Sequence, residues 1–414
     1  MTAALTGTRS QLPDQWPAAL SPDCLEVIDM PTPYLVTDLD TVVRRLEAFT
    51  AALPGVLPFY AMKCNPAPEI LATMRDHGAG FEIASLGELQ MLQRQGVDPA
   101  GVLYSNPVKP PAHIAAAHAA GLWRFSFDSP NELRKLAEHA PGSAVYLRLR
   151  VDDSASSFPL SRKFGAEVHE ARDLLVLARR LGLRPYGVTF HVGSQCGNAA
   201  AWREAIGAVG QIMADLLDEG IRLDLLDLGG GFPARYTEDV PTIGEIGEMV
   251  LPALDELLPY RPGLLVAEPG RHLVAEASVM AVSVIGREVR GTENWLFVDV
   301  GAYNGMMETI QLPTGWDFPM WTSVAGHGEI AELPFTITGP SCDSSDTMFY
   351  GALLPAGIDV GDIIYIGSTG AYTLSYASAF NGFPPPTPLF VGGPATLPRQ
   401  TTGEPARAGI PGER

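Results

Sequence analysis

Short apolar runs of β-type composition recur eight times between residues 59 and 270, and the stretches between them have helical patterning. The runs are FYAMK (59–63), GFEIAS (80–85), VLYSN (102–106), RFSFD (124–128), VYLRLR (145–150), YGVTFHV (186–192), LDLLDLG (223–229) and LLVAEPG (264–270). Helical stretches between them include 68–76, 86–95, 130–139 and 199–219. This alternation is typical of parallel βα units. Eight units predict a (β/α)8 TIM barrel over 41–275, and the absence of a GxGxxG turn disfavours an open doubly wound sheet.

The pattern changes near residue 276. The runs ASVMAVSVIGREV, NWLFVDVGA, LPFTITGP and DIIYIGSTG are strand-like and follow one another with no clear helices between the first few. They predict an antiparallel β domain over 276–390. The early run PYLVTD, within residues 21–40, is expected to join this domain, which would then contain both ends of the folded chain. Residues 1–20 and 391–414 are rich in Pro, Gly, Thr and charge, and are expected to be flexible tails.

Composition excludes several classes of partner. The formal net charge of −19 disfavours nucleic acid and anionic membranes, which attract basic surfaces. No apolar run reaches the roughly 18 residues of a transmembrane helix, and the N-terminus lacks the apolar centre of a signal peptide. The four cysteines have no metal-binding spacing and fit a reducing compartment. We therefore expect a cytoplasmic protein with a small-molecule substrate and no metal site.

Polar residues gather where the predicted barrel strands end. They are Lys63, Glu82 with Ser85, Arg148, His191 to Ser194, Gly229 to Gly231, and Glu268 to Arg271. In a barrel of this kind, active-site residues lie at the C-terminal ends of the strands. Six such placements are hard to explain by packing alone.

Each of these residues has a structural explanation beside a functional one. Lys63 either extends its amine to water from a strand end or forms a Schiff base. The triglycine 229–231 is either a flexible turn or, with Arg271, a phosphate cradle. Glu268 either pairs with a nearby cation or binds a ring nitrogen, and His191 either packs in the core or stacks on a planar ligand.

Taken together, the functional explanations describe a site for pyridoxal 5′-phosphate. A lysine holds the aldehyde carbon, glycines and an arginine hold the phosphate, and a carboxylate holds the pyridinium proton. A protonated ring nitrogen makes the cofactor a strong electron sink, whereas an arginine there would leave the ring neutral and suit racemisation. Glu268 therefore favours decarboxylation.

At this point the chain resembles the ornithine/diaminopimelate decarboxylase family, the fold-type III pyridoxal-phosphate enzymes with an alanine-racemase-like barrel. The matching motifs are PFYAMKCNPAPEIL, GFEIAS, LRLRVDDS, SRKFG, FHVGSQC, LDLGGGFP, AEPGR, TGPSCDSSD and GAYTLSYASAFNGF. They run in family order from about residue 33 to about residue 385, so the resemblance covers nearly the whole chain.

The resemblance implies a role for each matching residue. Lys63 is similar to the Schiff-base lysine, His191 to the residue stacked on the ring, and Glu268 to the partner of the pyridine nitrogen. The residues implied at the phosphate are Ser194, Gly230, Gly231, Arg271 and Tyr372. Glu82 and Arg148 match positions that support the lysine and the ring.

The resemblance also implies catalytic and substrate-binding residues in the second domain. Cys342 is similar to the thiol that reprotonates Cα, although a lone cysteine is usually a small buried hydrophobe. Asp343 matches the residue that binds the distal amine, and Tyr303, Gln311 and Phe380 complete the substrate set. In the family, the segment around Cys342 and Tyr303 reach the neighbouring subunit's cofactor, which implies a homodimer with shared sites.

The motif CDS resembles ornithine decarboxylases more than diaminopimelate decarboxylases. The stretch VDVGAYNGMMETIQLPTGWDF contains no Arg or Lys to bind the second carboxylate of diaminopimelate. Gln311, however, stands where similar bacterial enzymes have an acidic residue, and Glu308 or Asp317 are candidates to compensate. We expect decarboxylation of ornithine to putrescine in polyamine synthesis. Lysine, arginine or a modified diamino acid of a specialised pathway remain open as substrates. A non-catalytic role similar to that of antizyme inhibitors, or racemisation of an amino acid, also remains open.

Overall fold

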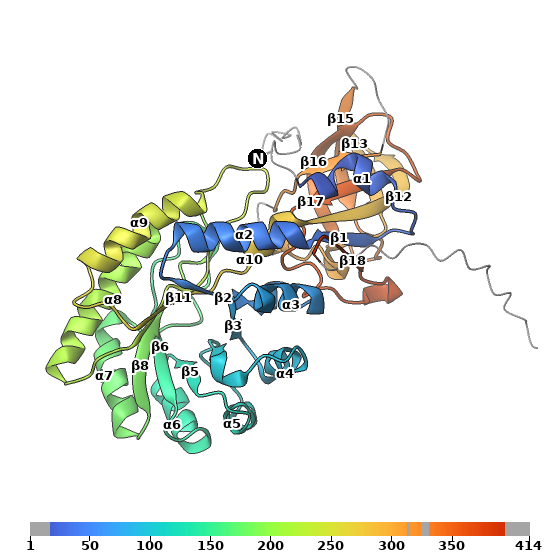
Figure 1. Cartoon of the computed structure of the whole chain (residues 1–414). Helices are drawn as coiled ribbons and strands as arrows, with labels where there is room; N and C mark the ends of the chain where they lie inside the picture. Colours follow the sequence, from blue (N-terminus) through green and yellow to red (C-terminus); the bar gives the residue numbers. More distant parts are fainter. Residues whose placement is uncertain (1–16, 313–314, 324–330, 394–414) are drawn as a thin grey trace, which may run out of the picture.

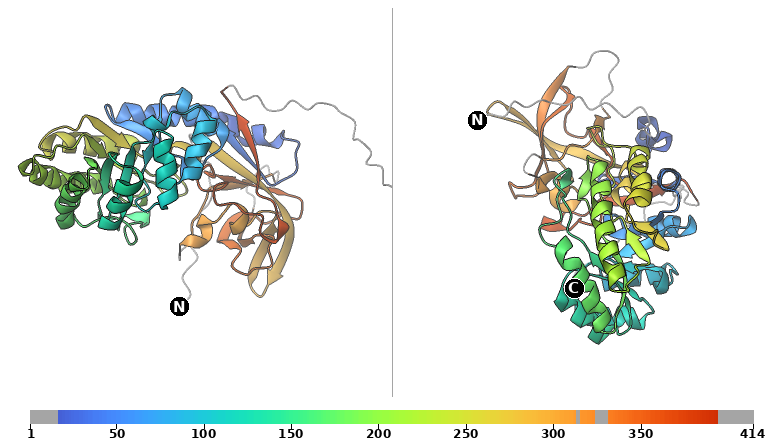
Figure 2. Two further views of the ribbon diagram at one scale, coloured as in Figure 1. Left: turned by 90° about the horizontal axis from the view of Figure 1, so that it is seen from below. Right: turned by 90° about the vertical axis from the view of Figure 1, so that its left-hand side faces the viewer.

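The computed structural model describes residues 17–312, 315–323 and 331–393, which form a barrel and a β domain lying side by side (Figures 1 and 2). The barrel is closed, with strand order β10-β11-β2-β3-β4-β5-β6-β8 and parallel pairing throughout, as the sequence predicted. Its strands are β2 (Leu57–Ala61), β3 (Gly80–Ile83), β4 (Leu103–Tyr104), β5 (Arg124–Phe127), β6 (Ala144–Arg148), β8 (Arg184–Thr189), β10 (Leu225–Asp227) and β11 (Leu264–Ala267).

Helices surround this barrel (Figure 1). They are α2 (Leu39–Ala52), α3 (Pro68–Asp76), α4 (Leu86–Arg94), α5 (Pro111–Ala119), α6 (Pro130–His139), α7 (Val168–Arg180), α8 (Ala200–Asp218), α9 (Ile243–Glu256) and the short α10 (Arg271–Val274). Local sequence sets where several begin. Ser129 accepts the Glu132 N–H at 3.3 Å and Pro130 follows it, a start signal in which the cap contributes about 1 kcal/mol. Thr242 and Glu245 form a capping box at α9.

The barrel strands are buried on both faces, which is why they read as apolar runs rather than as alternating patterns. Inside the barrel, one cluster joins side chains from six strands: Phe59, Leu103, Ala144, Tyr146, Tyr186, Leu225 and Val266. These residues fill the barrel below the C-terminal ends of its strands. We therefore expect the ligand site at that end rather than inside the barrel.

The β domain is a mixed sheet in which most pairs are antiparallel. Its strands are β1 (Tyr34–Asp38), β12 (Ser278–Arg290), β13 (Glu293–Val298), β14 (Met320–Thr322), β15 (Glu332–Thr338), β16 (Thr347–Pro355), β17 (Ile363–Gly367) and β18 (Thr387–Val391). The expected N-terminal strand joins it, because β1 pairs antiparallel with β12 and parallel with β18. The pair β13–β15 is also parallel.

One segment of the β domain, residues 368–375, lies against the first loop of the barrel. Asn65 donates its amide to the Gly370 carbonyl at 2.8 Å, and the Tyr372 N–H donates to the Cys64 carbonyl at 2.7 Å. Tyr372 has φ of 57°, a conformation rare outside glycine. These bonds bring Tyr372 next to Lys63 although the two are far apart in the sequence.

The chain ends and shorter elements complete the fold. The expected tails lie mostly outside the described residues, but Leu20 follows residues 18–19 in a short 3-10 helix and is fully buried. Further short elements are α1 (Pro22–Glu26), α11 (Glu308–Gln311), β7 (Ser156–Phe158) and β9 (Ser194–Cys196). Within the described ranges, no helix is long and apolar enough to span a bilayer.

Candidate active site

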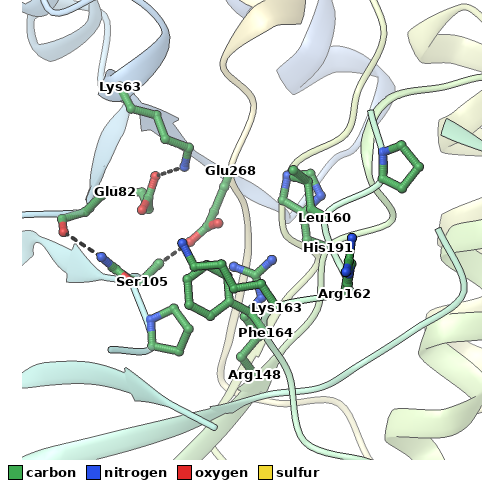
Figure 3. Close-up of a pocket in the computed structure, with 14 residues that line it drawn as sticks. Lys63, Glu82, Ser105, Arg148, Leu160, Arg162, Lys163, Phe164, His191 and Glu268 are labelled. Carbon is green, nitrogen blue, oxygen red and sulfur yellow. Dashed lines mark hydrogen bonds and ion pairs between the residues drawn. The ribbon is translucent and has the colours of Figure 1, made fainter. Parts of the chain in front are cut away.

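A cavity of about 480 Å³ opens at the C-terminal ends of the barrel strands (Figure 3). This volume is typical of a small-molecule site. Its lining includes five residues that the sequence analysis singled out, namely Lys63, Glu82, Arg148, His191 and Glu268. They come from four separate strand ends and from the turn after β2, so the closure of the barrel brings them together.

Lys63 lies in a 3-10 turn (Met62–Cys64) just after β2, not on the strand itself as the sequence suggested. Its Nζ donates to Glu82 at 2.7 Å, and its side chain is 40 % exposed, toward the cavity. Burial alone would lower the pKa of Lys63. The negative charge of Glu82, with further contributions from Tyr372 and Glu268, outweighs burial and raises that pKa. The amine is therefore held as an ammonium until the local charges change.

Glu268, directly after β11, is 6 % exposed and lies in a network of buried polar groups. Ser105 donates a short hydrogen bond to it and is itself 2.9 Å from the Tyr146 hydroxyl. The Asp227 carboxyl is hydrogen-bonded to Glu268 as well. Burial, reinforced by the charge of Asp227, raises the pKa of Glu268 to about 8, and burial raises that of Asp227 to about 6. The pair therefore holds a proton at neutral pH, mainly on Glu268.

His191 faces the cavity as a neutral ring. Burial, with the nearby charges of Arg148 and Lys63, lowers its pKa well below the usual range. Its Nδ1 accepts the Gly193 N–H at 3.0 Å, which leaves the proton of the neutral ring on Nε2. A neutral imidazole can stack on a flat cationic ring without charge repulsion.

The triglycine packs closely under this ring. A Cβ added to Gly230 would lie 2.8 Å from His191 Nε2 and 3.0 Å from the Glu268 carbonyl. Gly229 and Gly231 have φ of 63° and 101°, so both require glycine for their conformation. A side chain at Gly230 would collide with His191 and the Glu268 carbonyl, and one at Gly229 or Gly231 would collide with the backbone of Phe190 or Gly193.

Beyond His191, three of the residues expected at a phosphate group lie together. Arg271 is 3.4 Å from the Ser194 hydroxyl, and its guanidinium lies 4.8 Å from the centre of the Tyr372 ring. The same guanidinium is bound by both oxygens of Glu308 and by the Tyr236 hydroxyl at 2.7 Å. Glu308 therefore lies on Arg271, at this end of the site, and not as a free carboxylate for a distal amine.

These residues fit pyridoxal phosphate. The ammonium of Lys63, the protonated carboxyl of Glu268 and the neutral ring of His191 all line the cavity, and Gly230 has no side chain to crowd that ring. Ser194, Arg271 and Tyr372 supply hydrogen-bond donors suited to a phosphate group, in a cluster that lies outside the described lining of the cavity.

The remaining candidates gather on the β domain. The Tyr303 hydroxyl donates to Asp343 at 2.8 Å, and the Tyr303 ring lies 4.7 Å from that of Phe380. Cys342 is exposed, with its Sγ 3.5 Å from Asn381 Oδ1. Among the described residues, those that line the Lys63 cavity all belong to the barrel. We call Tyr303, Cys342, Asp343 and Phe380 the Cys342 cluster. Within a single chain, this cluster does not line the Lys63 cavity.

Gln311 is exposed at the end of α11 and lies outside the cavity lining as well. Asp317, the other proposed compensating carboxylate, lines a different pocket together with Glu238 and Trp316. Neither side chain lines the Lys63 cavity of its own chain.

Sequence reasoning missed several residues of the site. Ser105 follows the apolar VLY of β4, and Asp227 lies inside the apolar run of β10. A buried carboxylate in a strand is rare enough to serve as a signal. Arg162 and Phe164 line the cavity from the loop after β7. That loop belongs to the segment between barrel strand β6 and α7, and although both residues lie in the SRKFG motif, only the fold reveals that they face the cavity.

Comparisons with known proteins agree with this geometry. Residues 39–275 match the family model described as pyridoxal-dependent decarboxylase, pyridoxal binding domain. The lysine/ornithine decarboxylase of Selenomonas ruminantium is 36 % identical, over 86 % of this chain and 88 % of that protein. The ornithine decarboxylase of Schizosaccharomyces pombe is 37 % identical over 84 % and 81 % of the two chains. The solved lysine/ornithine decarboxylase of Vibrio vulnificus, complexed with putrescine, superposes with a TM-score of 0.81 at 31 % identity, covering 90 % and 99 %.

The fold and the site thus define a pyridoxal-phosphate enzyme built on a TIM barrel with an attached β domain. The chain belongs to the ornithine decarboxylase-like, fold-type III family of pyridoxal-dependent decarboxylases, as the motifs predicted. It is a pyridoxal-phosphate-dependent amino-acid decarboxylase.

Proposed function

We propose that this enzyme decarboxylates L-ornithine to putrescine and carbon dioxide. The observation that carries the proposal is Asp343. The Ser345 N–H and the Tyr303 hydroxyl lower the pKa of this carboxyl, so it is ionised at neutral pH. Its described partners are neutral, which leaves its charge available to a substrate ammonium. The names of the relatives above point to the same class of substrate.

The cofactor, when bound, supplies an electron sink for the pair of electrons left when the bond from Cα to the carboxylate breaks. Lys63, positioned by Glu82, would hold the cofactor. His191 would lie against the ring, and Glu268 would hold the proton at the ring nitrogen. Ser194, Gly230, Gly231, Arg271 and Tyr372 would bind the phosphate, and Arg148 would support the ring.

After carbon dioxide leaves, Cα must gain one proton. The exposed thiol of Cys342 is the proposed donor, and the proton passes from Sγ to Cα. Tyr303 and Phe380 form the wall beside Asp343 and orient the substrate side chain.

We further propose that the enzyme is a cytoplasmic homodimer with shared sites. The Cys342 cluster lies on the β domain and outside the cavity lining, so neither the proposed proton donor Cys342 nor the proposed amine-binding Asp343 lines the cavity of its own chain. A second copy that places its Cys342 cluster over the first chain's cavity supplies both.

Lysine, arginine or a modified diamino acid is the second candidate substrate, and Gln311 is the reason to keep it. A neutral amide in place of a second carboxylate weakens the grip on a terminal ammonium. Glu308, the candidate replacement for that carboxylate, is bound to Arg271 instead.

The test is a carbon dioxide release assay across ornithine, lysine, arginine, diaminopimelate and glutamate, for the wild type and for Gln311→Asp. We expect the highest kcat/KM with ornithine, and a further gain for ornithine in the variant. Preferred turnover of a substrate without a distal cation would contradict the proposal. If Gln311→Asp leaves the ranking of substrates by kcat/KM unchanged, Gln311 is not part of the substrate site.

A further inference from the structure

Lys109 is a fully buried lysine that the mechanism above does not use. Its side chain is 0 % exposed, and its Nζ contacts the Ser126 carbonyl at 2.6 Å, the Asn106 carbonyl at 2.9 Å and Glu132 at 3.0 Å. The three N–H donors of the ammonium therefore have three acceptors. Burying a charged group costs free energy unless the charge is fully paired, so we looked for a role of the Lys109 ammonium.

The acceptors of Lys109 come from three different parts of the barrel. Asn106 lies in the loop after β4, Ser126 lies in β5, and Glu132 lies in α6. Glu132 also accepts the backbone N–H of Lys109 at 3.2 Å and pairs with Lys135 at 2.5 Å. The single ammonium thus connects neighbouring βα units at the loop through which Asn106 lines the cavity.

The loop that Lys109 holds is weakly supported by the sheet. Strand β4 has only two residues, Leu103 and Tyr104, and pairs with β5 through one register position, Tyr104 with Phe125. On the other side, Ser105 still bonds to the Ile83 carbonyl at 3.0 Å. Toward β5, the bridge from the Asn106 carbonyl through the ammonium to the Ser126 carbonyl takes the place of ladder hydrogen bonds.

That loop forms a wall of the active site. Ser105, Asn106 and Pro107 all line the cavity, and Ser105 donates to Glu268. The Asn106 amide in turn donates to the Ala84 carbonyl, another lining residue, at 3.2 Å. A shift of this loop would move the Ser105 hydroxyl, which donates a hydrogen bond to Glu268.

We propose that Lys109 is a positioning residue: its buried ammonium fixes the Ser105 hydroxyl against Glu268 and thereby sets how Glu268 holds its proton. The inference rests on the proposed role of Glu268 opposite the cofactor ring. Lys109 does not touch the cavity and acts only through the loop 105–107.

The test compares Lys109→Met, Ser105→Ala and the double variant as holoenzymes. Three quantities are measured: kcat, KM, and the pH dependence of the visible absorbance of the bound cofactor. We expect Lys109→Met to lower kcat about tenfold with KM within about threefold, as for loss of an interaction that acts on the transition state. The absorbance profile should shift in the same direction as in Ser105→Ala. The kcat of the double variant should be no lower than that of the less active single variant, because both substitutions remove the same effect.

Lys135→Met is the matched control, because Lys135 binds the same Glu132 from the partly exposed side and donates to the Lys109 carbonyl at 2.7 Å, but does not contact Asn106 or Ser126. It should retain the wild-type kcat and absorbance profile. If Lys109→Met lowers only the melting temperature and leaves both readouts at wild-type values, Lys109 is merely structural and the inference is wrong. The same conclusion follows if Lys135→Met reproduces the full shift.

Should Lys109→Met fail to fold, Glu132→Gln loosens the same ammonium while keeping the size of its partner. A shift of the absorbance profile toward that of Ser105→Ala is then expected, and an unshifted profile overturns the inference. A wild-type protein with no visible cofactor absorbance would instead contradict the role of Lys63, so the two failures are distinguishable.

Discussion

At the barrel mouth, Glu82 and Glu268 are 2 % and 6 % exposed, and each has its hydrogen-bond partners within the same chain. On the β domain, Cys342 is exposed and Phe380 is 41 % exposed, with few bonds to hold them. Buried, mutually bonded groups keep fixed positions and shifted pKa values without any partner. Exposed groups keep ordinary surroundings until something covers them. The comparison indicates that one chain pre-forms the barrel mouth, whereas the proposed dimer would be needed to complete the substrate end.

The largest effect should come from Lys63→Ala, which removes the anchor at the mouth. We expect a fall in kcat of about 10⁴-fold or more, as for other covalent catalytic residues, and loss of the visible absorbance of the bound cofactor. Lys135→Ala, outside the cavity lining, should retain both. Normal turnover by Lys63→Ala would contradict the assignment of the site.

Cys342→Ala should lower kcat by about 10²- to 10⁴-fold, because it removes the proposed proton donor. Mixing this variant with Lys63→Ala and allowing the subunits to exchange tests the sharing of sites directly. Half of the random dimers would carry one intact site, so activity should recover to about a quarter of the wild-type value. No recovery, with exchange verified by a subunit tag, would show that the two regions do not meet across a dimer.

Glu268→Gln tests the buried carboxyl pair. The variant should lose about 10²-fold or more in kcat, since the amide cannot hold the ring proton. The folded-state pKa of Glu268 is raised from 4.5 to about 8, so between those values the folded chain binds a proton that the unfolded chain lacks. Stability of the cofactor-free enzyme should therefore fall as pH rises through this window.

Glu268→Gln should weaken the dependence of stability on pH. It should also raise the melting temperature at pH 8 by roughly a few degrees, measured by calorimetry. Thr242→Ala, which removes a distant helix cap, is the control and should leave the slope with pH unchanged. If stability depends on pH as steeply in Glu268→Gln as in the wild type, Glu268 is ionised in the folded state.

The smallest effect is expected from Asp343→Asn, at the exposed rim. It should raise KM for ornithine about tenfold and leave kcat within about threefold, because an ion pair near solvent contributes modestly. Diamino substrates should be affected more than a monoamino competitor. An equal effect on both would show that Asp343 does not bind the distal amine.

The barrel was predictable because its determinants are local. The alternation of apolar runs and helical stretches repeats often enough to identify each strand, and Ser129 and Thr242 mark helix starts within a few residues. Lys63, His191 and Glu268 could be singled out because they break apolar runs at strand ends. Ser105 was missed because it resembles an ordinary polar residue until its neighbours are known, whereas Asp227, a carboxylate inside an apolar run, carried a signal that was not used.

The sequence alone therefore determined the fold class, the family and the lysine proposed as the cofactor anchor, because periodicity and motif order are written along the chain. Tertiary structure decided which groups share a proton, which carboxylate neutralises Arg271 and which residues face Lys63. Those questions depend on distances and burial. The Glu268–Asp227 pair, Glu308 on Arg271 and the Lys109 bridge each join residues from separate elements, so no local pattern can specify them. The separation of Cys342 from the cavity is likewise a matter of how two domains pack.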